Sequence, residues 1–205
     1  MIACLDLEGV LIPEIWINVA DRTGIAALRR TTRDEPDYDK LMRGRIEILD
    51  QHKLTLGDIQ DVIAGMDPLP GAGDFLAWLK SRAQVIILSD TFYEFADPLM
   101  RQLARPTLLC HRLVIDDQGF VRDYRLRQPD QKRAAVNALR SLNYQVIAVG
   151  DSFNDIGMLE AAHAGFFIHP PPTIPPRFPQ FTVTNSYAEL LAQIEQASAR
   201  LKAAA

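Results

Sequence analysis

Three short apolar runs recur along the chain, at residues 2–5, 85–88 and 146–149. None shows the polar alternation of a half-exposed strand, and such runs are typical of parallel strands that are covered on both faces. Gly9 and Pro13 follow the first run closely, which favours a strand over a helix there. The pattern therefore predicts three buried strands.

Segments with the spacing of amphipathic helices lie between and after these strands. They span residues 71–82, 131–142, 155–162 and 187–202. Strands that alternate with helices predict an α/β fold with a Rossmann-like, mostly parallel sheet.

Three further segments carry local signals. Residues 111–116 and 120–126 flank a Gly-containing turn and predict a hairpin. The proline-rich stretch 169–179 predicts an extended surface loop without helix or strand. Pro98 either kinks a helix or begins one that is capped by Asp97, and the sequence leaves both open.

Residues 14–68 interrupt the alternation of strands and helices. Apolar residues recur there at helical spacing in three stretches, prolines bound the segment on both sides, and no convincing strand is present. We predict a small all-helical cap domain at residues 14–68. It would be inserted after the first strand of a core domain that comprises residues 1–13 and 69–205.

Composition and charge exclude several classes of protein. A net charge of −4 and a pI of about 5.6 argue against a nucleic-acid-binding surface. Cys4 and Cys110 are not spaced as a CxxC pair, so buried strand positions are a better explanation than a disulfide or zinc site. No apolar run reaches membrane-spanning length, and Asp6 and Glu8 interrupt the region that a signal peptide needs apolar. We expect a cytoplasmic protein without nucleic-acid or membrane partners.

Each apolar run ends in a polar cluster. The clusters are Asp6 with Glu8, Ser89 with Asp90, and Asp151 with Asn154 and Asp155. Ligands bind at the carboxyl ends of strands in open α/β sheets, so we expect the clusters to converge. Converging carboxylates repel one another unless a cation compensates them, and oxygen-only ligands favour Mg²⁺ over zinc. One such Asp alone would be explained by a helix cap or turn, whereas three clusters favour a magnesium site.

These motifs, together with Lys132, resemble in order and spacing the motif set of the haloacid dehalogenase superfamily. The resemblance covers nearly the whole chain, because the helical insert sits where that superfamily's first type of cap sits. It implies that Asp6 attacks phosphorus and becomes an aspartyl phosphate. It also implies that Mg²⁺ is held by Asp6, Asp151, Asp155 and the Glu8 position, the last through its backbone carbonyl in relatives. Asn154 would orient these neighbours or metal-bound water.

The remaining motif residues would bind the phosphoryl group, again by resemblance. Ser89 would donate to phosphate oxygens, and Lys132 would place a cation beside Asp6, unless it is simply solvated helix surface. Glu8 departs from the superfamily's usual Asp, keeping the acid/base chemistry with a longer reach. Asp90 stands where Gly is usual. We expect this acceptor-only carboxylate to contact an amino group or to accept from an alcohol.

Residues of the predicted cap point to the substrate. Arg45 shares a helical face with Leu41 and Leu49, and a buried-face arginine needs an anionic partner. That partner is either a substrate carboxylate or an internal residue such as Glu14. Together Glu14, Tyr38 and Arg45 resemble the phosphoserine phosphatase pattern. There Glu meets the substrate ammonium, Arg its carboxylate, and an aromatic ring shields the site.

Longer segments, including residues 31–34, 36–39 and 88–95, resemble the bacterial bifunctional phosphoserine phosphatase/homoserine phosphotransferase family. That family carries the same Glu in place of Asp and is described as homodimeric. The resemblance implies a ping-pong scheme in which O-phosphoserine phosphorylates Asp6, and water or homoserine then takes the phosphoryl group. Two alternatives stay open: a capped phosphatase for another small phosphomonoester, and a non-catalytic binding module on the same scaffold.

Overall fold

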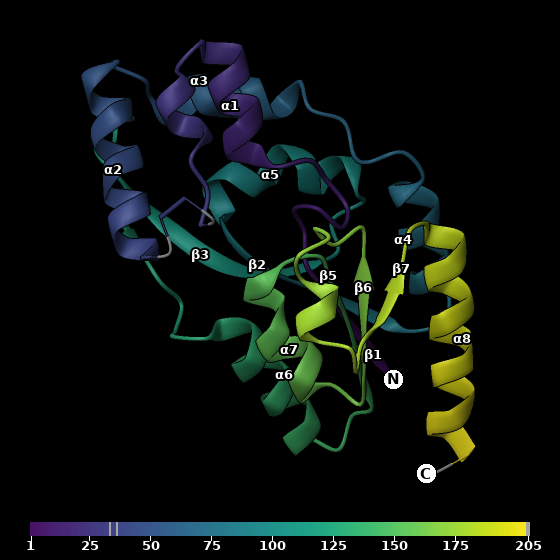
Figure 1. The fold of residues 1–205 in the computed structure, drawn as a ribbon. Coiled ribbons are helices and arrows are strands. Elements are labelled where there is room, and N and C mark those ends of the chain that lie inside the picture. The colour runs from purple at the N-terminus through teal and green to yellow at the C-terminus, as the bar shows by residue number, and fades with distance from the viewer. Residues whose placement is uncertain (33, 36, 204–205) are drawn as a thin grey trace.

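The computed structural model describes residues 1–32, 34–35 and 37–203 (Figure 1). Arg33 and Pro36, which belong to two of the motif segments above, lie outside the described residues. The strands are β1 (Ile2–Leu5), β2 (Gln84–Phe92), β3 (Thr107–Ile115), β4 (Val121–Arg125), β5 (Val146–Gly150), β6 (Ala164–Ile168) and β7 (Thr182–Thr184). The α-helices are α1 (Ile15–Thr23), α2 (Tyr38–Gln51), α3 (Leu56–Ala64), α4 (Ala72–Lys80), α5 (Tyr93–Gln102), α6 (Gln131–Ser141), α7 (Ile156–Ala161) and α8 (Tyr187–Ala203). Three short 3₁₀ turns complete the list: η1 (Ala26–Arg29), η2 (Phe153–Asp155) and η3 (Pro175–Arg177).

In the described part of the chain one sheet runs in the order β4-β3-β2-β1-β5-β6-β7. All neighbouring strands are parallel except β3 and β4, which form the predicted antiparallel hairpin. The strand order reverses at β1, which pairs with β2 on one side and β5 on the other. Ligand sites of α/β sheets form at such a switch point. The predicted Rossmann-like, mostly parallel α/β fold is confirmed.

Helices cover both faces of the sheet (Figure 1). In β1, Ala3 and Leu5 belong to the larger apolar core, which also holds residues of α4, α5 and α8. Ile2 and Cys4 belong to a second core with residues of α6 and α7. Successive strand side chains point to opposite faces, so a strand covered on both must be apolar throughout. This explains the absence of polar alternation.

Helices α1, α2 and α3 and turn η1 make up the inserted segment, and its described residues contain no strand. In Figure 1 these helices lie together beside the end of the sheet that carries β3. Helix α3 packs on α5, and α2 packs on β4. The division into a cap at 14–68 and a core remains a prediction.

Pro98 lies inside α5, which begins at Tyr93, so the alternative of a helix beginning near Asp97 is wrong. A proline lacks the N–H that would bond the carbonyl four residues earlier. That carbonyl belongs to Glu94, and it accepts a hydrogen bond from Gln60 Nε2 of α3 instead (2.7 Å). The inserted segment thus supplies the bond that the helix lacks.

The proline-rich stretch is less irregular than predicted. It contains the 3₁₀ turn η3, which begins with prolines, and Ile174 just before it is 1% exposed. Proline is tolerated in the first turn of a helix, where its N–H would have no partner. Because Ile174 is buried in the second core, the proline-rich stretch is anchored to the protein, whereas its composition alone predicted a surface loop.

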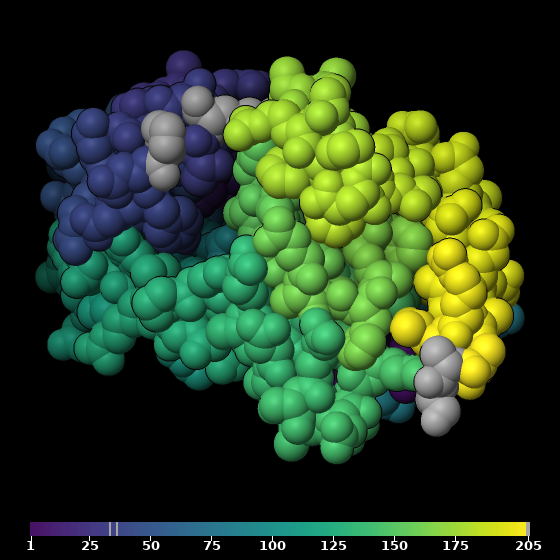
Figure 2. All heavy atoms as spheres, turned by 60° about the horizontal axis from the view of Figure 1, so that its bottom comes forward, coloured from purple at the N-terminus to yellow at the C-terminus, as the bar shows by residue number. Residues whose placement is uncertain are grey.

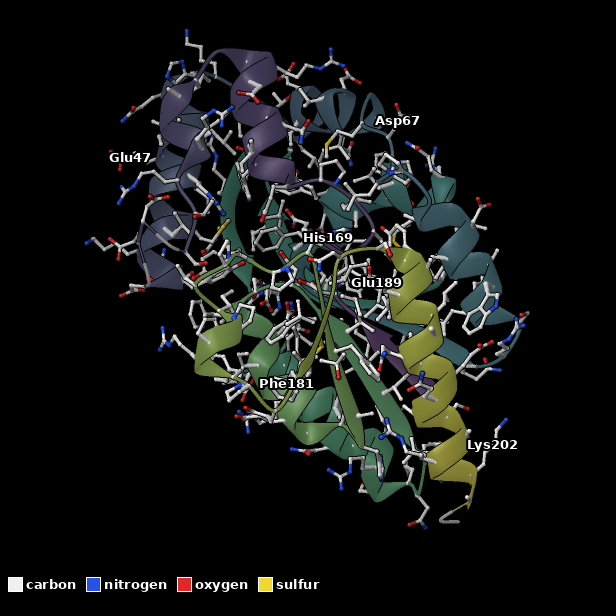
Figure 3. All side chains as sticks on the ribbon, turned by 45° about the vertical axis from the view of Figure 1, so that its right-hand side comes forward. Glu47, Asp67, His169, Phe181, Glu189 and Lys202 are labelled. Atoms are coloured by element: carbon white, nitrogen blue, oxygen red, sulfur yellow. The ribbon has the colours of Figure 1, made fainter. Side chains whose placement is uncertain are left out.

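Helix α8 closes the described chain along one side of the sheet. Glu189 lies in its first turn and Lys202 in its last (Figure 3), the charges that a helix dipole favours at each end. None of the helices in the described ranges is long and apolar enough to cross a membrane.

Candidate active site

The loop after β1 places Asp6 and makes a tight turn behind it. Leu7 N–H donates to Asp6 Oδ1 (2.8 Å), and Ile12 N–H returns to the Leu7 carbonyl (3.1 Å). Gly9 has φ +76°, and a Cβ at this position would lie 2.4 Å from Asp151 Oδ2. Glycine therefore lets the loop lie directly against the Asp151 carboxylate.

The loop after β5 is closed by Asp155, which is fully buried. Its Oδ2 accepts from the backbone N–H groups of Asp151 (2.9 Å) and Ser152 (3.0 Å). Gly150 allows this arrangement, because a Cβ there would overlap the Asp155 side chain at 2.4 Å. These hydrogen bonds fix the position of the Asp155 carboxylate and close the loop around it.

Asp6, Asp151 and Asp155 each offer a carboxylate oxygen, and these oxygens lie within 4.8 Å of one another. Mg²⁺ binds oxygen ligands at about 2.0–2.1 Å in octahedral geometry, so its ligand oxygens lie about 3–4 Å apart. The three carboxylates fit that requirement. The Glu8 carboxylate faces elsewhere, so a contribution of Glu8 to a metal would have to come from its backbone.

Lys132 on α6 is a buried cation, with 2% of its side chain exposed, and not solvated helix surface. Its Nζ lies 2.7 Å from Asp155 Oδ1, 2.9 Å from Asp6 Oδ1 and 3.8 Å from Asp90 Oδ2. Burial alone lowers the pKa of Lys132, but Asp155, Asp6 and Asp90 outweigh it and hold that pKa well above its usual value. Lys132 is therefore charged.

The pKa of Asp6 lies well above its usual value, first because of burial and then because of Asp155, while Lys132 acts in the opposite direction. A divalent cation beside Asp6 would lower that pKa, since a nearby positive charge favours the carboxylate. Lys132 and a metal would therefore act together to keep Asp6 ionised.

Glu8 points away from the three aspartates and toward α1. Its Oε2 accepts from the Ile15 N–H (2.8 Å), and its carboxyl shares a hydrogen bond with Glu14. Burial, followed by the charge of Glu14, raises the pKa of Glu8 to about 8. At neutral pH Glu8 therefore favours its protonated form, in a carboxyl that faces Glu14 and the start of α1.

Arg45 is buried and contacts no carboxylate closely. Its Nη2 donates to the Arg30 carbonyl (2.7 Å), and its guanidinium lies 4.6 Å from the centre of the Trp16 ring. No ion pair within 4.0 Å joins it to Glu14 among the described residues, so the internal salt bridge considered above is wrong. Nε has no hydrogen-bond partner. Burial lowers the pKa of Arg45 only to about 10, so it stays charged.

Asp90 is held by several protein donors. Its Oδ2 accepts from Asn154 Nδ2 (2.9 Å) and its Oδ1 from Gln131 Nε2 (3.2 Å), while His111 Nε2 lies 3.5 Å away. Burial raises the pKa of Asp90, but Lys132, His111, Asn154 and Gln131 more than offset it and hold that pKa well below its usual range. Asp90 is an ionised carboxylate that the protein itself binds.

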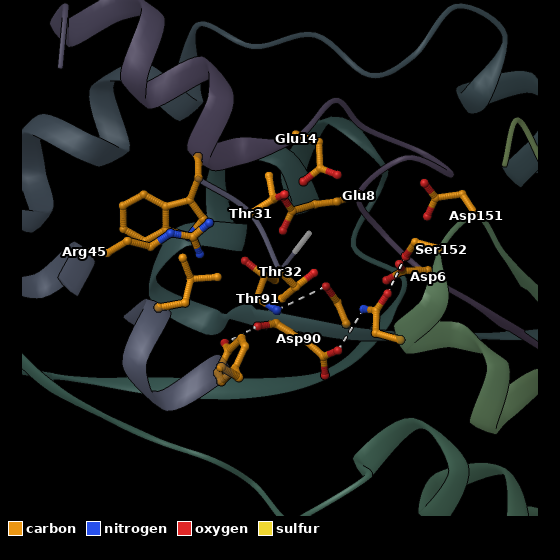
Figure 4. Close-up of a pocket in the computed structure, with 15 residues that line it drawn as sticks. Asp6, Glu8, Glu14, Thr31, Thr32, Arg45, Asp90, Thr91, Asp151 and Ser152 are labelled. Carbon is orange, nitrogen blue, oxygen red and sulfur yellow. Dashed lines mark hydrogen bonds between the residues drawn. The ribbon is translucent and has the colours of Figure 1, made fainter. Parts of the chain in front are cut away.

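A cavity of about 120 Å³ lies among these residues (Figure 4). Of the residues singled out in the sequence, it is lined by Asp6, Glu8, Glu14, Tyr38, Arg45, Ser89, Asp90, Asp151 and Asn154. Lys132 and Asp155 lie behind this lining, in contact with Asp6 and with the loop after β5. Figure 4 shows Arg45 on one side of the cavity and Asp6 with Asp151 on the other.

Five residues that line this cavity were not predicted from the sequence. They are Trp16, Thr31, Thr32, Thr91 and Ser152. Thr91 and Ser152 adjoin predicted motif residues, and Trp16 follows Glu14 by two positions. Their closeness in the sequence to predicted site residues could have indicated that they line the cavity. Thr31 and Thr32 belong to the segment 31–34 that carries part of the family resemblance, but no role in the site was predicted for them.

This arrangement sets a buried aspartate at the switch point of an α/β sheet, beside carboxylates that could hold a cation and under a helical segment. The sequence matches the family of haloacid dehalogenase-like hydrolases over residues 1–163. The chain belongs to the haloacid dehalogenase-like hydrolase family, and the resemblance inferred from the motifs is confirmed.

Individual relatives share most of the chain. The phosphoserine phosphatase ThrH of Pseudomonas aeruginosa is 59% identical over 199 residues, 97% of either chain. A phosphoserine phosphatase of Pseudomonas syringae pv. tomato is 57% identical over 199 residues, 97% of this chain and 84% of that protein. The crystal structure of an apo phosphoserine phosphatase matches with a TM-score of 0.76 at 19% identity, over 93% of this chain and 97% of that one. This structural likeness bears on the fold alone.

Proposed function

We propose that the protein is a magnesium-dependent phosphoserine phosphatase that acts through an aspartyl phosphate at Asp6 and also transfers the phosphoryl group to homoserine. One observation carries the proposal. A single cavity places Asp6 opposite Arg45, with Glu14 between them in the lining. The names of the relatives that are 59% and 57% identical support it.

The cavity offers a separate partner for each group of O-phosphoserine. Arg45 is charged, buried and has an unused Nε, so it would bind the substrate carboxylate. Glu14 would accept from the ammonium group. Tyr38, whose hydroxyl is fixed on the Asp90 carbonyl (2.9 Å), would shield the substrate from solvent.

In the first step an Asp6 carboxylate oxygen would attack phosphorus, and the bond to the serine oxygen would break. Glu8 would turn from Glu14 toward that leaving oxygen and donate its proton, since its raised pKa keeps it protonated at neutral pH. Lys132 and the Ser89 hydroxyl would stabilise charge on the phosphoryl oxygens. Mg²⁺ held by Asp6, Asp151 and Asp155 would neutralise further charge there.

In the second step water or the homoserine hydroxyl would attack the phosphorylated Asp6, with Glu8 now accepting the proton. Water gives inorganic phosphate, and homoserine gives its phosphate ester. Both acceptors would use the position that serine leaves, because attack opposite Asp6 is required in each direction.

With Mg²⁺ present, the purified protein is expected to release phosphate from O-phosphoserine, and EDTA is expected to abolish this release. Added homoserine is expected to yield O-phosphohomoserine, measured by ³¹P NMR. A lack of phosphate release from phosphoserine would refute the phosphatase, whereas its release without ester formation would refute only the transfer.

Arg45→Met is expected to lower kcat/KM for O-phosphoserine by about a hundredfold, because a buried charge-assisted contact to the carboxylate is lost. Phosphoethanolamine, which lacks that carboxylate, should be affected less than about threefold. Arg43→Met provides the matched control, since Arg43 lies on the same helix, pairs with Asp39 at 2.9 Å and is exposed. Equal losses on both substrates would favour the alternative of a capped phosphatase for another small phosphomonoester.

The homodimer implied by the family resemblance, and the cytoplasmic location expected from the sequence, stay predictions within this proposal. Light scattering of the purified protein tests the first.

A further inference from the structure

A second and larger cavity, of about 970 Å³, adjoins the catalytic cavity. Apolar side chains, among them Leu126, Phe153 and Ile174, form part of its lining. In Figure 2 the surface is hollowed where the blue-purple segment meets the green segments. Among the described residues, those that line both cavities are Thr32, Tyr38, Asp90, Ser152 and Asn154. We call these five residues, which lie where the two cavities adjoin, the wall.

Four of the wall residues are joined in one chain of hydrogen bonds (Figure 4). The Tyr38 hydroxyl donates to the Asp90 carbonyl (2.9 Å), and Asn154 Nδ2 donates to Asp90 Oδ2 (2.9 Å). The Ser152 hydroxyl donates to Asn154 Oδ1. The chain runs from α2 in the inserted segment to the loop after β5, and Asp90 is at its centre.

Two residues that line the larger cavity, His111 and Gln131, hold the Asp90 carboxylate. His111 Nδ1 accepts from the Arg127 N–H (3.1 Å), so the ring proton of neutral His111 sits on Nε2, which faces Asp90 Oδ1 at 3.5 Å. Gln131 Nε2 donates to the same oxygen (3.2 Å) and to the Ser89 carbonyl. His111 and Gln131 are 3% and 4% exposed, and they line the larger cavity but not the catalytic one.

We propose that His111 and Gln131, as positioning residues for Asp90, keep this wall closed and so keep solvent of the larger cavity away from phosphorylated Asp6. The wall would thereby set the share of phosphoryl groups that pass to an alcohol instead of water. This inference rests on the proposed function. It also explains why an acceptor-only carboxylate stands beside a phosphate site: its partners are protein donors.

The chemistry of the two outcomes differs only in the attacking oxygen. That oxygen bonds to phosphorus, the bond from phosphorus to Asp6 breaks, and the proton of the attacking group passes to Glu8. The catalytic cavity is much the smaller of the two, about 120 Å³ against about 970 Å³, and an alcohol bound in it would displace water from beside Asp6. With the wall open, solvent would still reach the intermediate, which a closed site protects from hydrolysis.

His111→Phe removes the Nε2–H donor and keeps a ring against Phe92 and Tyr38, whose ring centres lie 6.3 and 6.4 Å away. With phosphoserine and homoserine, we expect its ratio of phosphohomoserine to inorganic phosphate to fall by about three- to tenfold. Gln131→Met should act in the same direction, and His111→Gln, which restores a donor, should recover part of the ratio. His163→Phe is the control. His163 Nδ1 also accepts a backbone N–H (3.1 Å, from Val146), but it lines neither cavity.

A second measurement tests the role of the wall without phosphoserine or homoserine. With p-nitrophenyl phosphate as donor and no alcohol, rapid-quench dephosphorylation of Asp6 should be faster in His111→Phe and Gln131→Met than in the unchanged protein. A wild-type partition ratio and a wild-type dephosphorylation rate in both variants would overturn the inference. A protein that makes no phosphate ester at all refutes the proposed transfer, while the dephosphorylation rates still decide on the wall. Gln131→Met decides alone if His111→Phe does not fold.

Discussion

Asp6→Asn protein is expected to lose at least about a thousandfold in kcat for phosphate release, since an amide cannot form the acyl phosphate that a carboxylate forms. Asn preserves the size of the side chain and the position after β1. Asp6 lies 2.9 Å from Lys132 and within 4.8 Å of the Asp151 and Asp155 oxygens. Steady-state phosphate release and ³²P labelling of the denatured protein measure the effect.

The same change is expected to raise the melting temperature of the metal-free protein at neutral pH. Burial and Asp155 raise the pKa of Asp6 in the folded state, so the folded protein loses stability as pH rises from the ordinary carboxyl pKa through that raised pKa. An uncharged Asn escapes that penalty. Loss of activity with a gain in stability cannot come from misfolding. Asp74→Asn, at an exposed position in the first turn of α4, is the control and should change neither property greatly. Substantial turnover by Asp6→Asn would rule out Asp6 as the nucleophile.

The fold was predictable because its strongest determinants are local. A strand that is covered by helices on both faces must be apolar throughout. In β1 the side chains accordingly divide between the two cores. Features set by distant partners were not predictable. Pro98 remains inside α5 because Gln60, from another helix, satisfies the carbonyl of Glu94. Ile174 is buried because the second core accepts it, although its neighbours are prolines.

The site divides in the same way. Residues at strand ends, such as Asp6, Ser89 and Asp151, were found because topology alone brings them together. The partners of Asp90 were not, because His111 lies on β3 and Gln131 begins α6, and only the folded sheet places them on one carboxylate. The direction of Glu8 depended likewise on the free N–H of Ile15 at the start of α1. Motif spacing carries no information on such contacts.

Lys132→Met is expected to reduce phosphate release by about a hundred- to thousandfold, because a preorganised cation next to the transferring group is lost. It is also expected to destabilise the metal-free protein by about 3–5 kcal/mol at pH 7.5, as removal of one partner from a buried ion cluster leaves the others uncompensated. Lys132 neutralises Asp155 and Asp6 at 2.7 and 2.9 Å, and Met matches the lysine side chain as far as Cε but lacks the charged Nζ. Urea unfolding and phosphate release measure the two effects.

The pH dependence of this destabilisation distinguishes lost charge from lost packing. Without Lys132 the folded-state pKa of Asp6 would rise further. The variant would therefore lose stability as pH increases through that pKa. It would regain stability at lower pH, where the Asp6 carboxyl is protonated. The difference from the unchanged protein should therefore shrink between pH 7.5 and pH 5, whereas a packing defect would persist at both. Lys80→Met, at an exposed lysine on α4, is the control. A pH-independent difference would mean that Lys132 acts mainly by filling space, and would remove the electrostatic basis for its part in phosphoryl transfer.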